Sequence, residues 1–252
     1  MLLGHTIKKS REWMVTHGDD ELSPDQLIQA DRLMAKLLAG EPLPYLVGSK
    51  AFFGLDFIVT PGVLIPRPET EQLVEECIQW LEIHTHKRKI VDVGTGSGVI
   101  AVTLADHFDD ANITAIDISP EALTIAKQNA QKYGVDQRID FLQCDLFSGC
   151  SGRFDVIAAN LPYIPSSTLR SLQVAQYEPL LALDGGNDGL DLIKKLLQQS
   201  TDKLEPGGVI LLEIETSQAE AATQLADQYW PKAQKSILFD LAKHPRILKI
   251  YS

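Results

Sequence analysis

Four consecutive residues, Asn160-Leu161-Pro162-Tyr163, have the types and spacing to bind a small planar amide or amine. They follow an apolar run at residues 154–159, which is typical of a buried strand in a parallel sheet. Open α/β sheets bind ligands at the carboxyl edge of such strands. Pro162 favours an extended Leu161, so the Asn160 side-chain carbonyl and the Leu161 backbone carbonyl can face one target. Two converging acceptors suit an NH2 group, although the same residues also fit an ordinary turn.

A glycine-rich loop at residues 94–98 lies upstream and follows another apolar strand pattern. Glycine lets the backbone turn tightly and lets a ligand approach closely. The dinucleotide fingerprint needs its third glycine at the position of Val99, and the Gly-Lys-Ser/Thr end of a P-loop is missing from the sequence. The loop therefore disfavours a pyrophosphate cradle.

Aspartates accompany three successive predicted strands at the same edge of the sheet. Asp117 closes a strand where a carboxylate can accept hydrogen bonds from both ribose hydroxyls. Asp145 is placed to accept from an adenine amine, and Leu146 beside it to pack on the ring. Asp92 lies under the glycine loop, where it orients the loop amides or holds a cationic ligand group. A single aspartate is most simply a loop cap, but three favour a cationic adenosine ligand such as S-adenosylmethionine.

Alternating strand and helix patterns from residue 89 onward predict a mainly parallel sheet with helices on both faces. The expected strands are residues 90–93, 113–117, 139–143, 154–159, 208–215, 236–240 and 246–251. The expected helices are residues 98–107, 120–133, 190–201 and 217–229. The segment between the last two strands is too short for a crossover helix, so these strands are expected to pair antiparallel.

Residues 1–60 are expected to form a small helical cap with a hairpin linker, and residues 61–252 the main α/β domain. Ser23 and Pro24 begin a helix that ends at Gly40, and an earlier helix is expected at residues 7–15. Residues 52–59 predict two short strands around a glycine turn. Another helix begins at Pro68, and Arg67 before it is a candidate for the ligand site.

The composition of the chain indicates in which cellular compartment the protein is expected and which classes of partner it is expected to bind. The 252-residue chain carries a formal net charge of −11, and an acidic surface repels phosphate backbones, which argues against non-specific binding to nucleic acid. Neither a nucleic acid nor a membrane is expected as a partner. It has no apolar run that would span a membrane and no signal-peptide pattern. Three cysteines without a CxxC pair fit a reducing cytoplasm and predict neither a disulfide framework nor a metal site. A monomer is expected.

Taken together, the motifs resemble the HemK/PrmC family, the protein-(glutamine) methyltransferases that act on peptide chain release factors. The segments that carry the resemblance are Ile65-Pro66-Arg67-Pro68-Glu69-Thr70-Glu71, Asp92-Val93-Gly94-Thr95-Gly96-Ser97-Gly98, Asn160-Leu161-Pro162-Tyr163-Ile164, and Tyr177-Glu178-Pro179 with Ala182-Leu183-Asp184-Gly185-Gly186. The resemblance implies a class I (Rossmann-like) methyltransferase domain. Its sheet would be seven-stranded and mostly parallel, with an antiparallel last strand, behind a small N-terminal helical cap and β-hairpin.

The resemblance also implies methyl transfer from S-adenosyl-L-methionine to the side-chain amide nitrogen of the glutamine in the Gly-Gly-Gln motif of release factors. Residues 1–60 would recognise the protein substrate. The implied donor contacts are Gly94, Thr95, Gly96, Ser97, Gly98, Asp117, Ile118, Asp145, Leu146 and Asn160. The implied glutamine contacts are Asn160, Leu161, Pro162 and Tyr163, of which Asn160, Pro162 and Tyr163 would be catalytic.

Two features depart from the family pattern. Leu161 stands where the family usually has proline, but the contact implied there uses a backbone carbonyl, which leucine also has, so retained activity is expected. The helical region is short for the family. The alternatives are a glutamine methyltransferase of a ribosomal protein, a nucleic-acid adenine N6-methyltransferase, and a non-catalytic cofactor-binding or scaffold protein; the adenine enzyme would need a basic groove for a flipped base.

Overall fold

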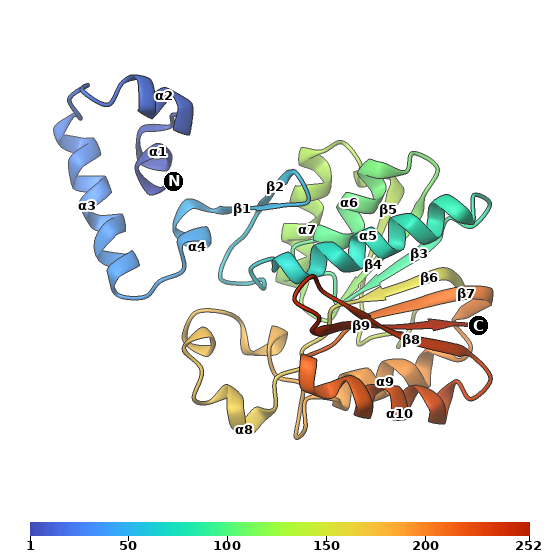
Figure 1. Cartoon of the computed structure of the whole chain (residues 1–252). Coiled ribbons are helices and arrows are strands. Elements are labelled where there is room, and N and C mark those ends of the chain that lie inside the picture. Colours follow the sequence, from blue (N-terminus) through green and yellow to red (C-terminus); the bar gives the residue numbers. More distant parts are fainter.

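The structure is a computed structural model, and it describes residues 1–252 except for the side chain of Arg11. A small helical part at the N-terminus lies beside a larger α/β part, and a two-stranded hairpin connects the two (Figure 1). None of the helices in the described part of the chain has the length and apolar character needed to cross a membrane.

The α/β part is built on one seven-stranded sheet with the strand order β5-β4-β3-β6-β7-β9-β8. Its strands are β3 (Lys89–Val93), β4 (Asn112–Asp117), β5 (Ile139–Gln143), β6 (Phe154–Ala159), β7 (Leu204–Glu213), β8 (Gln234–Phe239) and β9 (Pro245–Tyr251). Strands β3 to β7 pair in parallel, whereas β9 runs antiparallel to both β7 and β8. The predicted sheet and its antiparallel final pair are confirmed. Strand β7 begins before residue 208 because Leu204 pairs with Phe154 across a bulge.

Helices cover both faces of this sheet, as predicted (Figure 1). Helices α5 (Pro68–Ile83), α6 (Val99–His107) and α7 (Pro120–Lys132) pack on one face, and α9 (Asp191–Ser200) and α10 (Ala219–Tyr229) on the other. Successive strand residues alternate between the two cores: Val156 packs with the first group of helices and Ile157 with the second. Because both faces are buried, the strands are apolar almost throughout.

The N-terminal part contains α1 (Leu2–Ile7), α2 (Arg11–Thr16), α3 (Pro24–Leu38) and α4 (Leu43–Val47). The prediction of one helix at residues 7–15 is wrong. Lys8 adopts a left-handed conformation (φ 55°) that ends α1, and the Ser10 side chain accepts a hydrogen bond from the Trp13 amide to begin α2. Helix α3 is confirmed, with a capping box between Ser23 and Gln26.

The hairpin consists of β1 (Ser49–Phe52) and β2 (Leu55–Ile58). The predicted hairpin is confirmed, although its first strand begins at Ser49. Its two turn residues, Phe53 and Gly54, both have positive φ (48° and 77°), as a tight two-residue turn requires. The buried Asn129 side chain of α7 exchanges hydrogen bonds with the backbone of Ile58 (2.7 and 3.0 Å) and donates to the carbonyl of Ser97 (2.8 Å). One side chain therefore connects the hairpin to the glycine-rich loop.

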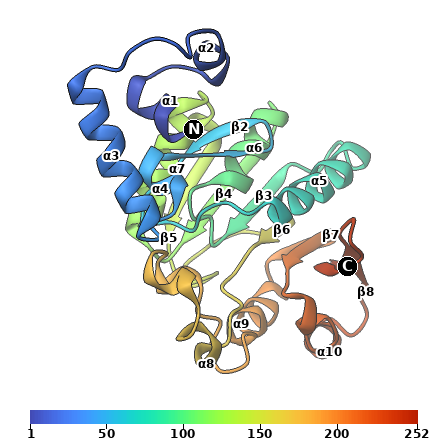
Figure 2. The same cartoon turned by 60° about the vertical axis from the view of Figure 1, so that its left-hand side comes forward.

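The segment after β6 carries the short helix α8 (Ser166–Leu169) and lies next to the C-terminal end of α3 (Figure 2). The Tyr177 hydroxyl donates a hydrogen bond to the Ala39 carbonyl (2.7 Å). Backbone hydrogen bonds between Ile164 and residues 183 and 185 hold the start of this segment against its end. The N-terminal part thus contacts the chain that directly follows Asn160-Leu161-Pro162-Tyr163.

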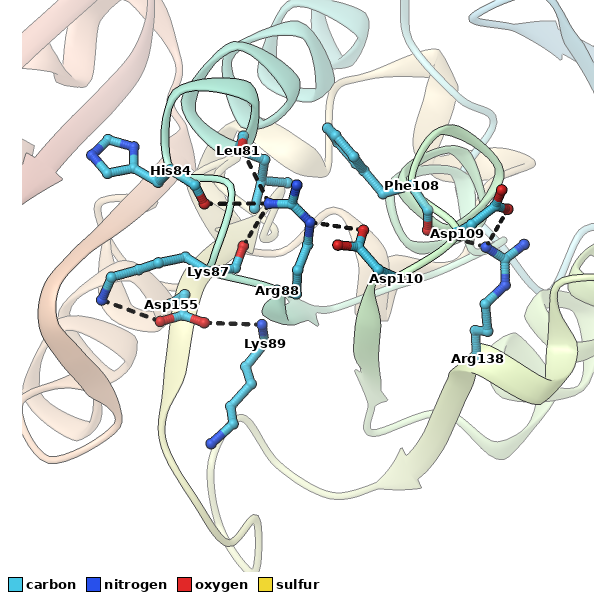
Figure 3. A network of polar contacts seen from close by, with 10 residues as sticks. All are labelled: Leu81, His84, Lys87, Arg88, Lys89, Phe108, Asp109, Asp110, Arg138 and Asp155. Carbon is cyan, nitrogen blue, oxygen red and sulfur yellow. Dashed lines mark hydrogen bonds and ion pairs between the residues drawn. The ribbon is translucent and has the colours of Figure 1, made fainter.

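A polar network fastens the opposite edge of the sheet, where β3 and β6 begin (Figure 3). Asp155 accepts a hydrogen bond from the Lys89 amide (3.0 Å) and forms an ion pair with Lys87 (3.3 Å). Arg88 pairs with Asp110 (2.8 Å) and also donates to three backbone carbonyls in the last turn of α5 and the loop that follows it. These ion pairs connect the starts of β3 and β6 with the loop after α5 and with the turn before β4, at the edge opposite the carboxyl ends of the strands.

Candidate active site

A cavity of about 320 Å³ opens at the carboxyl edge of the sheet, within the size range of small-molecule sites. Its walls come from the glycine-rich loop, the ends of β4, β5 and β6, and two outer segments. The lining residues include 61–64, 66, 67, 70, 94–97, 116–119, 144–146, 160–162, 179, 181 and 182. Most of the residues implied for donor and substrate contacts therefore surround one space.

The glycine-rich loop is held from below by Asp92. This fully buried carboxylate accepts hydrogen bonds from the Thr95 hydroxyl (2.6 Å) and from the Ala101 amide in the first turn of α6 (3.1 Å). Burial raises the pKa of Asp92 to about 7. Of the two predicted roles, its contacts support the orientation of the loop.

Gly98 lies behind the loop, at the start of α6. Its φ is 83°, and a Cβ atom there would approach the Ala126 Cβ atom of α7 to 3.0 Å. The need for glycine at this position is therefore explained by the close packing of α6 on α7. A donor contact by Gly98 stays a prediction.

Asp117 lies at the end of β4 and lines the cavity. Its carboxylate accepts hydrogen bonds from the amides of Gly96 and Ser119, both at 2.9 Å, and burial raises its pKa. Each carboxylate oxygen has a second lone pair, so the same group retains acceptor capacity toward a ribose. Ile118 follows in the cavity wall and is about half exposed.

Asp145 and Leu146 form the wall beyond β5. Leu146 is buried and adopts a left-handed conformation (φ 51°), which turns the chain sharply after Asp145. Asp145 forms an ion pair with Lys195 of α9. Lys195 was not predicted, because its pattern is that of an ordinary exposed helix position.

Asn160, Leu161 and Pro162 line the cavity at the end of β6. The Asn160 side-chain NH2 donates a hydrogen bond to the Thr70 hydroxyl (2.9 Å). Leu161 is buried, and its side chain lies 3.0 Å from where a Cβ atom on Gly94 would be. The glycine-rich loop and the predicted substrate-binding residues 160–163 are therefore in direct contact.

Tyr163 lies beyond the lining residues. Its carbonyl accepts a hydrogen bond from the Gln218 side chain (2.9 Å), and burial, with the nearby Glu213, raises the pKa of its hydroxyl to about 12. Tyr163 is therefore a neutral, partly buried side chain near neutral pH. The prediction that it stacks on the substrate amide is untested.

The segment before and in the first turn of α5 connects three parts of the molecule. Arg67 lines the cavity and pairs with Glu178 (2.5 Å), whose other oxygen accepts from the Ile65 amide (3.0 Å). Glu71 accepts from the Phe53 amide in the hairpin turn (2.9 Å), in addition to its favourable place in the helix dipole. Sequence reasoning missed these partners because the residues lie far apart along the chain.

Comparisons with known proteins agree with this geometry. A model described as "Methyltransferase domain" matches residues 84–232, and one described as "PrmC N-terminal domain" matches residues 1–48. The release factor glutamine methyltransferase of Moorella thermoacetica is 40% identical over 253 residues, covering all of this chain and 89% of that protein. The corresponding protein of Koribacter versatilis is 38% identical, covering 98% of this chain and 88% of that protein. The chain belongs to the release factor glutamine methyltransferase family.

A solved structure shows the same fold. The methyltransferase from Pyrococcus furiosus superposes with a TM-score of 0.56 at 19% identity, covering 86% of this chain and 96% of that one. The predicted class I methyltransferase fold and the resemblance to the HemK/PrmC family are confirmed, and the relatives do not favour the ribosomal-protein or adenine alternatives. As a release factor glutamine methyltransferase, the protein is an enzyme that uses S-adenosyl-L-methionine. Among the described residues, no group of His, Cys, Asp and Glu side chains is arranged to hold a metal ion.

Proposed function

We propose that this protein methylates the side-chain amide nitrogen of the glutamine in the Gly-Gly-Gln motif of peptide chain release factors, and that Asn160-Leu161-Pro162-Tyr163 hold that glutamine. The assignment of these residues to glutamine binding rests on the hydrogen bond between Asn160 and Thr70. The NH2 group of Asn160 is occupied by Thr70, which leaves the Asn160 carbonyl oxygen as an acceptor at the wall of the donor cavity. The names and full-length coverage of the relatives support the substrate.

The cavity fits S-adenosyl-L-methionine by its size and by its donor set. Asp117 offers acceptors for ribose, Asp145 and Leu146 form the wall proposed for the base, and the backbone of residues 94–97 lies along the cavity. The acidic character of this lining suits a ligand with sulfonium and ammonium groups. When bound, the donor supplies an electrophilic methyl group.

The residues at the end of β6 would prepare the acceptor nitrogen. A carboxamide nitrogen is a poor nucleophile because its lone pair is delocalised into the carbonyl group. The Asn160 and Leu161 carbonyl oxygens accept from its two hydrogens, which favours a pyramidal nitrogen and aims the lone pair. Positioning of this kind contributes on the order of 7–11 kcal/mol. Methyl transfer leaves the amide nitrogen positively charged with both of its hydrogens. This cation is very acidic and releases a proton without a strong base, so no catalytic histidine is needed.

We further propose that residues 1–60 form the unit that recognises the protein substrate. Helix α3 presents exposed apolar side chains, including Ile28 and Leu38, which are 68% and 80% exposed. The end of α3 contacts Tyr177, in the segment that follows the proposed glutamine site. The enzyme would act as a monomer in the cytoplasm, on protein and not on nucleic acid.

Mass spectrometry of release-factor glutamine, before and after incubation with the enzyme and S-adenosyl-L-methionine, tests the proposal. We expect a gain of one methyl group at the glutamine of Gly-Gly-Gln. Asn160→Ala should abolish transfer while largely sparing donor binding measured by calorimetry. Asn112→Ala is the matched control, because Asn112 is exposed at the far end of β4. An active Asn160→Ala enzyme would refute the mechanism, and an unmodified release factor with the wild-type enzyme would refute the substrate.

A further inference from the structure

Thr70 and Glu213 form a buried hydrogen-bonded chain that ends on Asn160. The Thr70 hydroxyl donates to the Glu213 carboxylate (2.7 Å) and accepts from the Asn160 NH2 group (2.9 Å). Thr70 belongs to the first turn of α5 and Glu213 is the last residue of β7; their exposed fractions are 2% and 3%. Helix α5 and the neighbouring strand β7 therefore converge on the amide that we place at the substrate.

The direction of donation along these hydrogen bonds follows from the single proton of the Thr70 hydroxyl. An ionised carboxylate can only accept hydrogen bonds, so the hydroxyl proton must point to Glu213. The Thr70 oxygen can then only accept from its other neighbour, so the NH2 group of Asn160 faces Thr70. The Asn160 carbonyl oxygen consequently faces the other way. The opposite amide orientation would place two acceptors against each other, which is unfavourable in a buried site.

We propose that Thr70 and Glu213 are positioning residues for methyl transfer, and that the Glu213 carboxylate, acting through Thr70, fixes the Asn160 amide in the orientation that accepts a hydrogen bond from the substrate. The inference rests on the proposed role of Asn160. Neither Thr70 nor Glu213 takes up the methyl group or the proton of the substrate. They determine which atom of Asn160 the substrate meets.

Protonation of Glu213 would release this constraint. Burial raises the pKa of Glu213 to about 7, and Glu69 of α5 raises it further. Hydrogen bonds from the side chains of Thr70 and Asn160 and the charge of Arg246 in β9 oppose the shift. Tyr163 also faces this group and is neutral near pH 7, and Arg246 is paired with Asp240. A protonated Glu213 can donate to the Thr70 oxygen, which frees the hydroxyl proton for the Asn160 carbonyl and turns the amide. Methyl transfer should therefore fall as the pH falls through about 7.

Three variants separate this role from simple packing. Thr70→Val keeps the shape but removes the hydroxyl, and we expect kcat to fall by about tenfold or more, the effect of a lost buried hydrogen bond. Thr70→Ser should restore most of kcat. Glu213→Gln retains an acceptor for the Thr70 proton but cannot titrate, so its pH profile should lack the acid limb near pH 7. The dissociation constant for S-adenosyl-L-methionine should change little in all three.

Thr103→Val is the matched control. Thr103 is a buried threonine of α6 whose hydroxyl has no hydrogen-bond partner in the described part of the structure. This variant should keep both the kcat and the pH profile of the wild-type enzyme. Wild-type kcat in Thr70→Val, an acid limb that persists in Glu213→Gln, or an equal loss in Thr103→Val would each overturn the inference.

A measurement without turnover distinguishes failure of this inference from failure of the proposed function. In wild-type protein the side-chain amide resonances of Asn160 should shift with an apparent pKa near that of Glu213, and in Glu213→Gln they should not. If the resonances shift but no release factor is methylated, the hydrogen-bonded arrangement is supported and the proposed substrate is refuted. Methylation without such a shift would refute the positioning role.

Discussion

The ion pair between Arg67 and Glu178 joins the start of α5 to the segment after β6, and we expect its removal to destabilise the enzyme measurably. The Glu178 side chain is 3% exposed, whereas the Arg67 side chain is 34% exposed. Glu178 also accepts a hydrogen bond from the Ile65 amide. Replacing Arg67 with methionine would keep much of the side-chain volume and leave Glu178 buried with one backbone donor.

The magnitude follows from how much of the pair is buried. Removing one partner of a fully buried pair costs about 3–5 kcal/mol, and a hydrogen bond to a charged group contributes about 1.5–3 kcal/mol. Because water reaches a third of Arg67 and the Ile65 amide still solvates Glu178, we expect Arg67→Met to cost about 2 kcal/mol. For a chain of this size that corresponds to a fall in Tm of about 4–8 °C.

Urea denaturation of wild type, Arg67→Met, Glu178→Gln and the double variant would measure the coupling between the two side chains. We expect a coupling energy of about 1 kcal/mol or more. Lys36→Met provides the control, because the Lys36–Glu41 pair is exposed and should contribute below about 0.5 kcal/mol. A coupling energy near zero, or a single variant as stable as wild type, would show that the burial argument is wrong.

Three other changes test separate parts of the structure. Gly98→Ala should cost about 1–3 kcal/mol in urea denaturation, because φ is 83° and the new Cβ atom would crowd Ala126; equal stability would contradict it. Leu161→Pro should raise the methylation rate by less than about a hundredfold, or roughly 2.7 kcal/mol, because the Leu161 carbonyl is already present; a larger gain would show that leucine impairs the site. The pKa of Asp92 is about 7 in the folded state, which is above its value in the unfolded chain. Between these two pKa values the folded state keeps the proton of Asp92 and the unfolded state loses it. The contribution of Asp92 to the free energy of unfolding therefore falls as the pH rises from about 4 to 7. Asp92→Asn should therefore lose less stability than wild type between about pH 5 and pH 8 in urea titrations, and an unchanged slope would exclude Asp92 as the source.

The sheet, its helices and the cavity lining could be predicted because they follow from local patterns. Continuous apolar strands, glycines at the loop and aspartates at strand ends are visible within short windows. The short N-terminal helices were predicted wrongly because one left-handed residue, Lys8, divides them. Such short helices have little intrinsic stability, so sequence pattern alone places them poorly.

The contacts that orient the site could not be predicted, because each joins residues far apart in sequence. Thr70 is 90 positions from Asn160 and 143 from Glu213, and Arg67 is 111 from Glu178. The acids at the start of α5 have a sufficient local explanation in the helix dipole, which hides their tertiary partners. A glutamate at the end of an otherwise apolar strand is the one sequence signal that could have drawn attention to Glu213, since a buried carboxylate needs a partner.

The replacement of the usual proline by Leu161 is accommodated by packing. Proline would restrict the backbone through its ring, whereas Leu161 has a buried side chain seated against Gly94 of the donor loop. Gly94 has a φ of 76°, and a Cβ atom there would meet the Leu161 side chain at 3.0 Å. This side-chain contact therefore connects the glycine-rich loop directly to the end of β6. Pro162 still favours an extended Leu161, so side-chain packing supplies the restraint that the missing ring would have provided.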